Sequence, residues 1–187
     1  NRLIETIAPG RICLLGENQD FLGLWVIASA IDLHIHIKGR RIKDKKLIIH
    51  LPDIGEVDII ELDKEIAYSK PRDYLKAGVK VLSDEGYKID FGIECTVRGE
   101  LPINAGVSSS SALVVGWIKF LLTNLGVVLP PAEVARLAHR AEVLEFNEPG
   151  GMMDHFTSSI GNTIFVDCVP PFSYHSLPVN PGEFVLG

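Results

Sequence analysis

The sequence predicts an α+β domain in which a mixed or antiparallel sheet is covered by helices. Segments with the alternation and β-branched residues of strands fill most of the first hundred residues, and segments with helical spacing of apolar residues mostly follow them. Strands that come before the helices, instead of alternating with them, favour α+β over a doubly wound parallel sheet. A chain of 187 residues with 47% hydrophobic and 22% charged residues can also bury a substantial core.

The expected elements follow from local patterns along the chain. Strands are expected at residues 4–15, 25–38, 46–50, 58–62, 89–98 and 162–168. Helices, with apolar residues three and four apart, are expected at residues 71–85, 110–125, 130–144 and 153–159. Within the first strand we expect a tight turn at Ala8-Pro9-Gly10, and the basic stretch 38–46 predicts a solvated hairpin. Trp25 and Trp117 are expected in the core.

Composition excludes several classes of protein. The formal net charge is -6 and no long basic run is present, which argues against a nucleic-acid binder. Three cysteines lie far apart, form no metal-like pair and indicate a reducing compartment, so we expect a cytoplasmic protein. The apolar stretch 112–129 is interrupted by Lys119, Thr123 and Asn124, which predicts a core helix and no membrane association.

The segment from Leu101 to Trp117 contains a strand end, a loop of small residues with four consecutive serines, and an apolar helix. A helix N-terminus exposes unpaired backbone N–H groups and the positive end of the helix dipole, and small residues let an anion approach them. The segment is neither a P-loop nor a dinucleotide fingerprint. Two interpretations stay open here: a serine-rich N-cap, or a phosphate cradle for a nucleotide. The cradle would comprise Asn104, Ala105, Gly106, Val107, Ser108, Ser109, Ser110 and Ser111.

Two further segments carry closely spaced polar residues. In the first, which follows Arg11, the side chains of Glu17, Asn18 and Asp20 are suited to hydrogen bonds with sugar hydroxyls. Its simpler interpretation is an acidic turn with Arg11 in a surface ion pair. In the second, residues 148–156, Asp154 follows a glycine turn near a helix start, and its simpler interpretation is an N-cap.

Taken in order, these three segments resemble the GHMP small-molecule kinases, a superfamily that includes galactokinase, homoserine kinase, mevalonate kinase and phosphomevalonate kinase. Residues 8–23 are similar to the galactokinase signature, which runs Pro-Gly-Arg, Gly-Glu-His and then Asp-Tyr. Residues 102–110 are similar to the family's Pro-x-x-x-Gly-Leu-Ser-Ser-Ser loop, and residues 150–155 to the Cys-Gly-Ile-Met-Asp-Gln segment. The resemblance extends from Ala8 to about Cys168.

The resemblance implies roles for individual residues. Asp154 matches the catalytic aspartate, which receives or orients the proton of the attacking hydroxyl, and Arg11 matches the arginine that stabilises phosphate charge. Ser110 and Glu142 match the ligands of Mg²⁺, an ion that prefers hard oxygen donors. The resemblance to kinases implies ATP as the phosphoryl donor. Phosphoryl transfer needs charge neutralisation and alignment, which Mg²⁺ supplies, so ATP and Mg²⁺ are the expected cofactors. The positions that match substrate contacts are Glu17, Asn18, Asp20, Gly151 and Asp154.

Several positions depart from the family pattern. Asn18 stands where histidine is usual, Phe21 where tyrosine is usual, and His155 where glutamine is usual, while Asn104 and Ala105 replace two loop glycines. The catalytic positions are retained but the sugar loop is altered, so galactose, another sugar, a uronic acid or a heptose derivative stay open as substrates. His155 is expected to be either a support for the site or a surface or packing residue.

The expected function is ATP-dependent phosphorylation of a monosaccharide at its anomeric hydroxyl, with a sugar and ATP as partners and no nucleic acid or membrane; the oligomeric state stays open. The alternatives are a mevalonate-type kinase or a catalytically silent sensor of sugar and nucleotide with the same fold. The resemblance implies that residues 1–187 form the N-terminal GHMP kinase domain, which is ribosomal protein S5 domain 2-like. It also implies that the ferredoxin-like second domain is absent from this chain.

Overall fold

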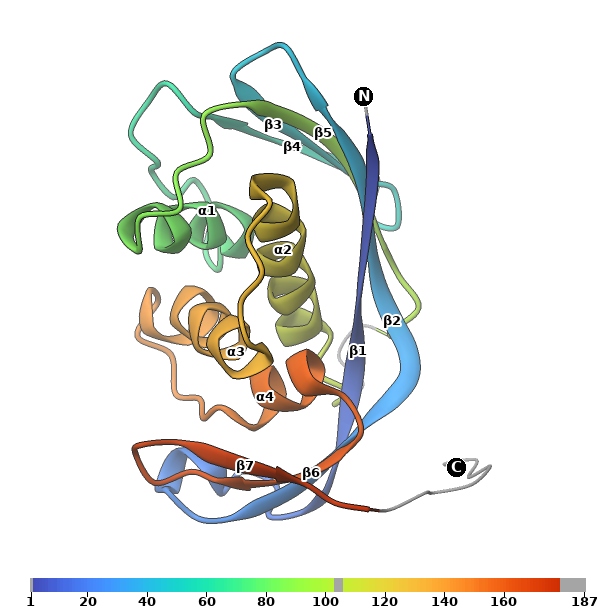
Figure 1. Cartoon of the computed structure of the whole chain (residues 1–187), viewed down its shortest axis with the longest axis vertical. Coiled ribbons are helices and arrows are strands. Elements are labelled where there is room, and N and C mark those ends of the chain that lie inside the picture. Colours follow the sequence, from blue (N-terminus) through green and yellow to red (C-terminus); the bar gives the residue numbers. More distant parts are fainter. Residues whose placement is uncertain (1, 103–105, 179–187) are drawn as a thin grey trace.

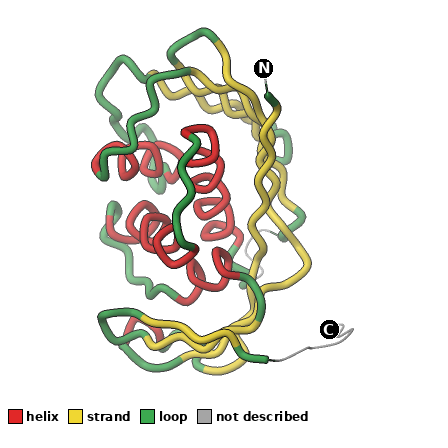
Figure 2. The backbone as a smooth tube through the Cα atoms, viewed as in Figure 1, coloured by secondary structure: helices red, strands yellow, loops and turns green. Residues whose placement is uncertain are grey.

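The computed structural model describes residues 2–102 and 106–178. A curved seven-stranded sheet forms one layer, and the helices pack against its concave face, as Figures 1 and 2 show. The strands are β1 (Leu3–Leu15), β2 (Val26–Ile42), β3 (Lys46–Leu51), β4 (Glu56–Glu61), β5 (Gly92–Gly99), β6 (Thr163–Asp167) and β7 (Ser173–Ser176). The α-helices are α1 (Tyr74–Asp84), α2 (Ser109–Leu125), α3 (Pro131–His139) and α4 (Met153–Ile160). The predicted α+β class is confirmed.

The long strand β2 organises the sheet. It pairs with β1 along one edge, while its second half pairs with β5 and its first half with β6 on the other edge. The main strand order is β4-β3-β5-β2-β6-β7, and all pairs are antiparallel except β3 with β5. The predicted hairpin at 38–46 is therefore wrong, because β5 lies between β2 and β3.

Strand β1 continues through residues 8–10, so the predicted tight turn at that point is also wrong. The irregularity is a shift in the β1–β2 register between Pro9 and Arg11. At this shift Gly10 lies so close to the loop before α2 that a Cβ on it would come within 2.9 Å of the Val107 carbonyl oxygen. Glycine is required there for close packing of two backbones, and that packing brings β1 to the start of α2.

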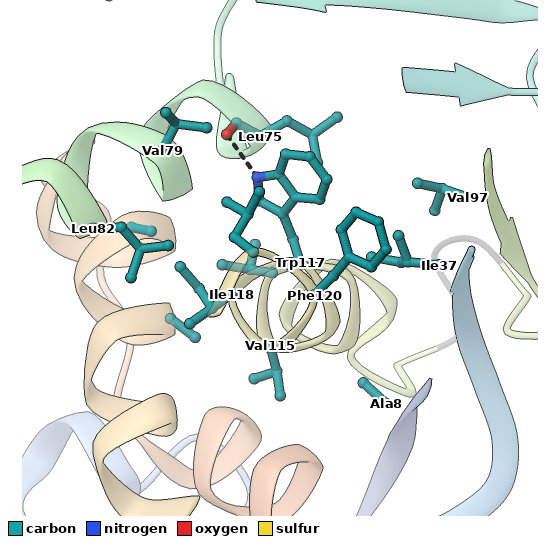
Figure 3. Packing of buried hydrophobic residues seen from close by; sticks show 14 of the residues in the cluster. Ala8, Ile37, Leu75, Val79, Leu82, Val97, Val115, Trp117, Ile118 and Phe120 are labelled. Carbon is teal, nitrogen blue, oxygen red and sulfur yellow. Dashed lines mark hydrogen bonds between the residues drawn. The ribbon is translucent and has the colours of Figure 1, made fainter. Parts of the chain in front are cut away.

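Helix α2 lies at the centre of the core, and neighbouring elements cover nearly every face of it. Trp117 is fully buried, donates its indole N–H to the Leu75 carbonyl at 2.9 Å and stacks on Phe120, as Figure 3 shows. Trp25, by contrast, is 66% exposed, so its predicted core position is wrong. Within the described residues no helix is both long and apolar enough to cross a membrane.

Helix ends and short elements account for the other differences. The predicted helix 130–144 consists of α3 and a five-residue π-helical turn, Arg140–Leu144. A short 3-10 helix, Asp20–Leu22, and the polar edge strand β7 were not predicted. The π-helical turn matters for the site, since such turns redirect side chains and Glu142 lies in this one.

Candidate active site

The site forms where β1, the start of α2 and the start of α4 meet. The Arg11 backbone N–H donates to the Val107 carbonyl at 3.1 Å, and the Arg11 Nη1 donates to the Gly106 carbonyl at 3.0 Å. These two bonds fix the residues just before α2 against β1. Of the predicted nucleotide loop, Asn104 and Ala105 lie outside the described residues, while residues 106–111 lie at the N-terminus of α2.

Asp154 is held between two partners from distant parts of the chain. Its Oδ1 accepts a hydrogen bond from Arg11 Nε at 2.7 Å, and its Oδ2 accepts one from the Ser108 hydroxyl at 2.5 Å. Met152, not Asp154, is the N-cap of α4. Ser108 is the N-cap residue of α2, but its side chain makes no capping bond. The capping interpretation is therefore wrong for Asp154, whereas Ser108 occupies the N-cap position of α2 but uses its hydroxyl to hold Asp154.

Arg11 is buried, with 6% of its surface exposed, so it is not the surface ion pair of the simpler interpretation. Burial by itself would lower the pKa of its guanidinium, but the attraction and hydrogen bond of Asp154 outweigh burial and raise that pKa. Glu17 adds a weaker attraction, with its Oε1 3.7 Å from Arg11 Nη2. The positive charge of Arg11 is thus permanent and lies directly beside Asp154.

Glu142 is a second buried acid near the start of α2. Burial by itself would raise the pKa of its carboxyl, but hydrogen bonding and attraction from His155, together with the Ser110 and Ser111 hydroxyls, lower it. The His155 Nε2 lies 2.7 Å from Glu142 Oε2. The two predicted metal-binding residues, Glu142 and Ser110, are therefore neighbours in the structure, and the Glu142 carboxyl is ionised.

Behind Glu142 lies a pair of histidines that the sequence did not identify as a unit. His155 is 2% exposed, and its Nδ1 has no hydrogen-bond partner among the described residues. The His139 ring packs edge-on against it at 5.2 Å and its Nε2 lies 3.2 Å from the Gly150 carbonyl. His155 is thus not a surface residue: it is packed against His139 and contacts Glu142, and only the structure reveals this second contact.

The third part of the site is the loop after β1. Asp20 is nearly buried: its Oδ2 accepts the Met153 backbone N–H at 3.3 Å and its Oδ1 accepts that of Phe21 at 3.0 Å. Gly151 packs directly against this carboxyl, and a Cβ on Gly151 would overlap it. Two predicted substrate residues, Asp20 and Gly151, are therefore in mutual contact, which fixes the loop beside α4.

These parts surround one cavity of about 370 Å³. Every predicted substrate residue lines this cavity. Phe21, Glu148 and Met153 also line it, although the sequence analysis did not select them. The position of Glu148 after the π-helical turn could not be read from local patterns. The lining residues are Arg11, Glu17, Asn18, Asp20, Phe21, Ser111, Glu142, Val143, Glu148, Pro149, Gly150, Gly151, Met153, Asp154 and His155.

Comparison with known proteins places this site in a family. Residues 73–162 match the family described as GHMP kinases N terminal domain, and residues 4–41 match the galactokinase galactose-binding signature. These two stretches contain Arg11, Glu17, Asp20, Glu142 and Asp154, so the matched segments supply both sides of the cavity.

Individual relatives agree. The chain is 31% identical to the galactokinase of Clostridium perfringens, over 94% of this chain and 47% of that protein, and 34% identical to that of Pyrococcus furiosus, over 98% and 52%. The structure of Lactococcus lactis galactokinase complexed with galactose matches with a TM-score of 0.83 at 27% identity, over 96% of this chain and 48% of that one.

The chain thus spans about half the length of the relatives it matches. Over that half, both the signature around Arg11 and the domain around Asp154 are those of one superfamily. The chain therefore belongs to the GHMP kinases, and within them it is galactokinase-like.

Proposed function

We propose that the protein is a sugar kinase that transfers a phosphoryl group from ATP to the anomeric hydroxyl of a monosaccharide. The observation that carries this proposal is the position of Asp154 at the cavity wall, held by Arg11 and Ser108. A carboxyl group fixed next to a sugar-sized cavity is suited to accept a proton from a bound hydroxyl. The galactokinase relatives support the same reaction class.

Arg11 serves two purposes in this proposal. Its Nε donates a hydrogen bond to Asp154 Oδ1 at 2.7 Å, which holds the carboxylate in place and puts a positive charge beside it. Its Nη1 also faces the Gly106 carbonyl at the start of the serine-rich loop, so its charge lies between proton acceptor and phosphate loop. There it reduces the repulsion between the carboxylate and an incoming phosphoryl group.

The residues present fit Mg-ATP. The N-terminus of the 17-residue helix α2 is not capped by the Ser108 side chain, so its first N–H groups are left for an anion. The Glu142 carboxylate and the neighbouring hydroxyls of Ser110 and Ser111 are hard oxygen donors. When bound, the metal neutralises phosphate charge. We propose that Glu142 and Ser110 hold the metal, and that residues 104–111 surround the phosphates.

The charge of the cavity indicates a neutral substrate. The lining contains four carboxylates besides Asp154, namely Glu17, Asp20, Glu142 and Glu148, and one guanidinium, that of Arg11. Arg72 pairs with Glu148 at 2.5 Å, which leaves the set with a net negative charge. Carboxylate and amide oxygens can accept hydrogen bonds from several sugar hydroxyls. A uronic acid would bring a further negative charge into this set, and an apolar acid of the mevalonate type would find few apolar walls. We therefore propose a neutral hexose or heptose as the substrate class.

The relatives are about twice as long as this chain, and we propose that residues 1–187 form the N-terminal domain of a two-domain kinase. The test of function thus uses the full-length protein with Mg-ATP and a panel of neutral sugars, their uronic acids and mevalonate, measuring ADP release. We expect turnover with a neutral sugar and a fall of at least about 100-fold in Asp154→Asn.

The matched control is Asp90→Asn, an exposed aspartate that does not line the cavity. This variant should retain full activity. A binding signal for ATP and sugar without any ADP release would support the silent sensor instead. Turnover with mevalonate but with no sugar would contradict the proposed substrate class.

A further inference from the structure

The convex face of the sheet carries a cluster of metal-ligating side chains outside the kinase site. The helices cover only the concave face (Figure 1). In β2, Ile35 and Ile37 point into that covered core, so the alternating His34 and His36 point to the open face. Glu100, which directly follows β5, completes a group whose ligand atoms all lie within 4.8 Å of one another.

Backbone hydrogen bonds hold the Glu100 carboxylate beside both rings. The Glu100 N–H donates to the His34 carbonyl at 2.9 Å, and the His34 N–H donates to Glu100 Oε2, also at 2.9 Å. The His34 backbone bond is the largest cause of a lowered pKa at Glu100. The carboxylate is thus oriented by the sheet itself and is negatively charged at neutral pH.

The distances within the cluster suit a shared cation. The His34 Nδ1 lies 3.5 Å from Glu100 Oε2, and the His36 Nε2 lies 3.6 Å from Glu100 Oε1. Ligand atoms at about 2.1 Å from a tetrahedral zinc ion are roughly 3.4 Å apart. Direct N–H···O hydrogen bonds are shorter, at about 2.7–3.2 Å. The observed separations are therefore nearer to those of two ligands on one metal.

The surrounding charges also favour a cation. Glu5 Oε1 and Asp32 Oδ1 each lie 4.0 Å from a histidine of the cluster. Lys38 and Arg98, which line the same surface hollow as His36 and Glu100, already have acidic partners: Lys38 is 3.4 Å from Glu5, and Arg98 is 3.2 Å from Asp53. Two imidazoles with a carboxylate are a donor set for zinc and similar transition ions, whereas Mg²⁺ prefers oxygen ligands alone.

We propose that His34, His36 and Glu100 form a binding site for a divalent transition-metal ion, with zinc as the representative ion. The site shares no residue with the cavity around Asp154, so it is independent of the proposed kinase activity. Because its ligands come from β2 and from the end of β5, a bound ion joins these two elements. Zinc should therefore stabilise the fold.

The test is a zinc titration of the full-length protein by calorimetry, in millimolar Mg²⁺ so that oxygen sites are occupied. Wild type is compared with His36→Asn and His34→Asn. The control is His50→Asn, because His50 faces a single carboxylate, Glu94, at 3.3 Å on the same sheet. Thermal unfolding with and without zinc is a second measurement, since a ligand of the native state raises the midpoint.

We expect one zinc equivalent in wild type and in His50→Asn, and at least tenfold weaker binding at that site in His36→Asn and in His34→Asn. Loss of outer-shell partners alone costs about 10–100-fold in metal affinity, and these are direct ligands. The zinc-dependent rise in midpoint should also disappear in both variants, while kinase activity is retained. Equal zinc affinity in His36→Asn and wild type, or no binding at 1 mM zinc, would overturn the proposal and leave the cluster as surface ion pairs.

Discussion

Two arginine–aspartate pairs lie on opposite faces of the sheet and differ mainly in burial. The Arg11 side chain is 8% exposed and its Nε is 2.7 Å from Asp154, whereas the Arg98 side chain is 66% exposed and its Nη1 is 3.2 Å from Asp53. Water screens the charges of the exposed pair. In the inner pair, removing either partner leaves the charge of the other without compensation. The same chemical pair can therefore hold a reactive group on one face and contribute little on the other.

The largest expected effect is that of Arg11→Met. The variant leaves the Asp154 carboxylate with Ser108 as its remaining described partner and removes the donor to the Gly106 carbonyl. The guanidinium of this pair is buried and the Asp154 side chain is 25% exposed, so removing the arginine is costly and we expect a loss of about 2–4 kcal/mol in unfolding free energy. Activity should fall at least about 100-fold. Urea unfolding and kcat measure the two effects, and a stability loss below 1 kcal/mol would contradict the burial argument.

Gly151→Ala tests the sugar side of the cavity. A Cβ at this position overlaps the Asp20 carboxyl, whereas a Cβ on Gly150 would lie 3.1 Å from a Val143 methyl group, which can move. We expect Gly151→Ala to cost about 1–3 kcal/mol and to raise KM for the sugar, because Asp20 must shift. Gly150→Ala is the matched control. Equal KM values in the two variants would show that Asp20 does not position the sugar.

The sequence predicted which residues lie together at this site better than it predicted their contacts. The motifs around Arg11, Ser110, Glu142 and Asp154 indicated which residues belong together. Local patterns could not show that the Ser108 hydroxyl bonds Asp154 instead of capping α2. That contact depends on how α4 packs against α2, which is a tertiary property.

The errors in the fold have the same cause. Strand β7 was missed because its residues, Ser-Tyr-His-Ser, lack an apolar alternation and depend on pairing with β6. The connection 38–46 has the composition of a hairpin, but β3 pairs with β5, a partner far along the chain. Trp25 was placed in the core by residue type alone, although it lies in the loop directly before β2 and is exposed.

The burial of His139 gives the site a pH dependence. Burial is the main cause of its lowered pKa, followed by repulsion from His155, while the Gly150 carbonyl, Glu142 and Asp20 oppose the shift. Since the folded-state pKa lies below the ordinary 6.5, the unfolded chain binds more protons under acidic conditions. The stabilising contribution is complete above pH 6.5 and is lost as pH falls through the folded-state pKa.

The measurement is the free energy of unfolding from pH 8 to pH 5. We expect His139→Gln to flatten the fall below pH 6.5, where one such group contributes at most about 1.4 kcal/mol per pH unit. An unchanged slope in His139→Gln would show that its burial does not control the acid response.

The smallest effect is expected for Arg98→Met, the counterpart of Arg11→Met on the open face. Asp53 keeps its hydrogen bond from the Gly99 N–H at 2.7 Å, and water replaces the guanidinium. We therefore expect a change below about 1 kcal/mol in unfolding free energy, shrinking further in 0.5 M salt, where the screening length is only a few ångströms. Urea unfolding at low and high salt measures this. A loss as large as that of Arg11→Met would mean that burial does not separate the two pairs, and the strength of the Asp154 site would need another physical cause.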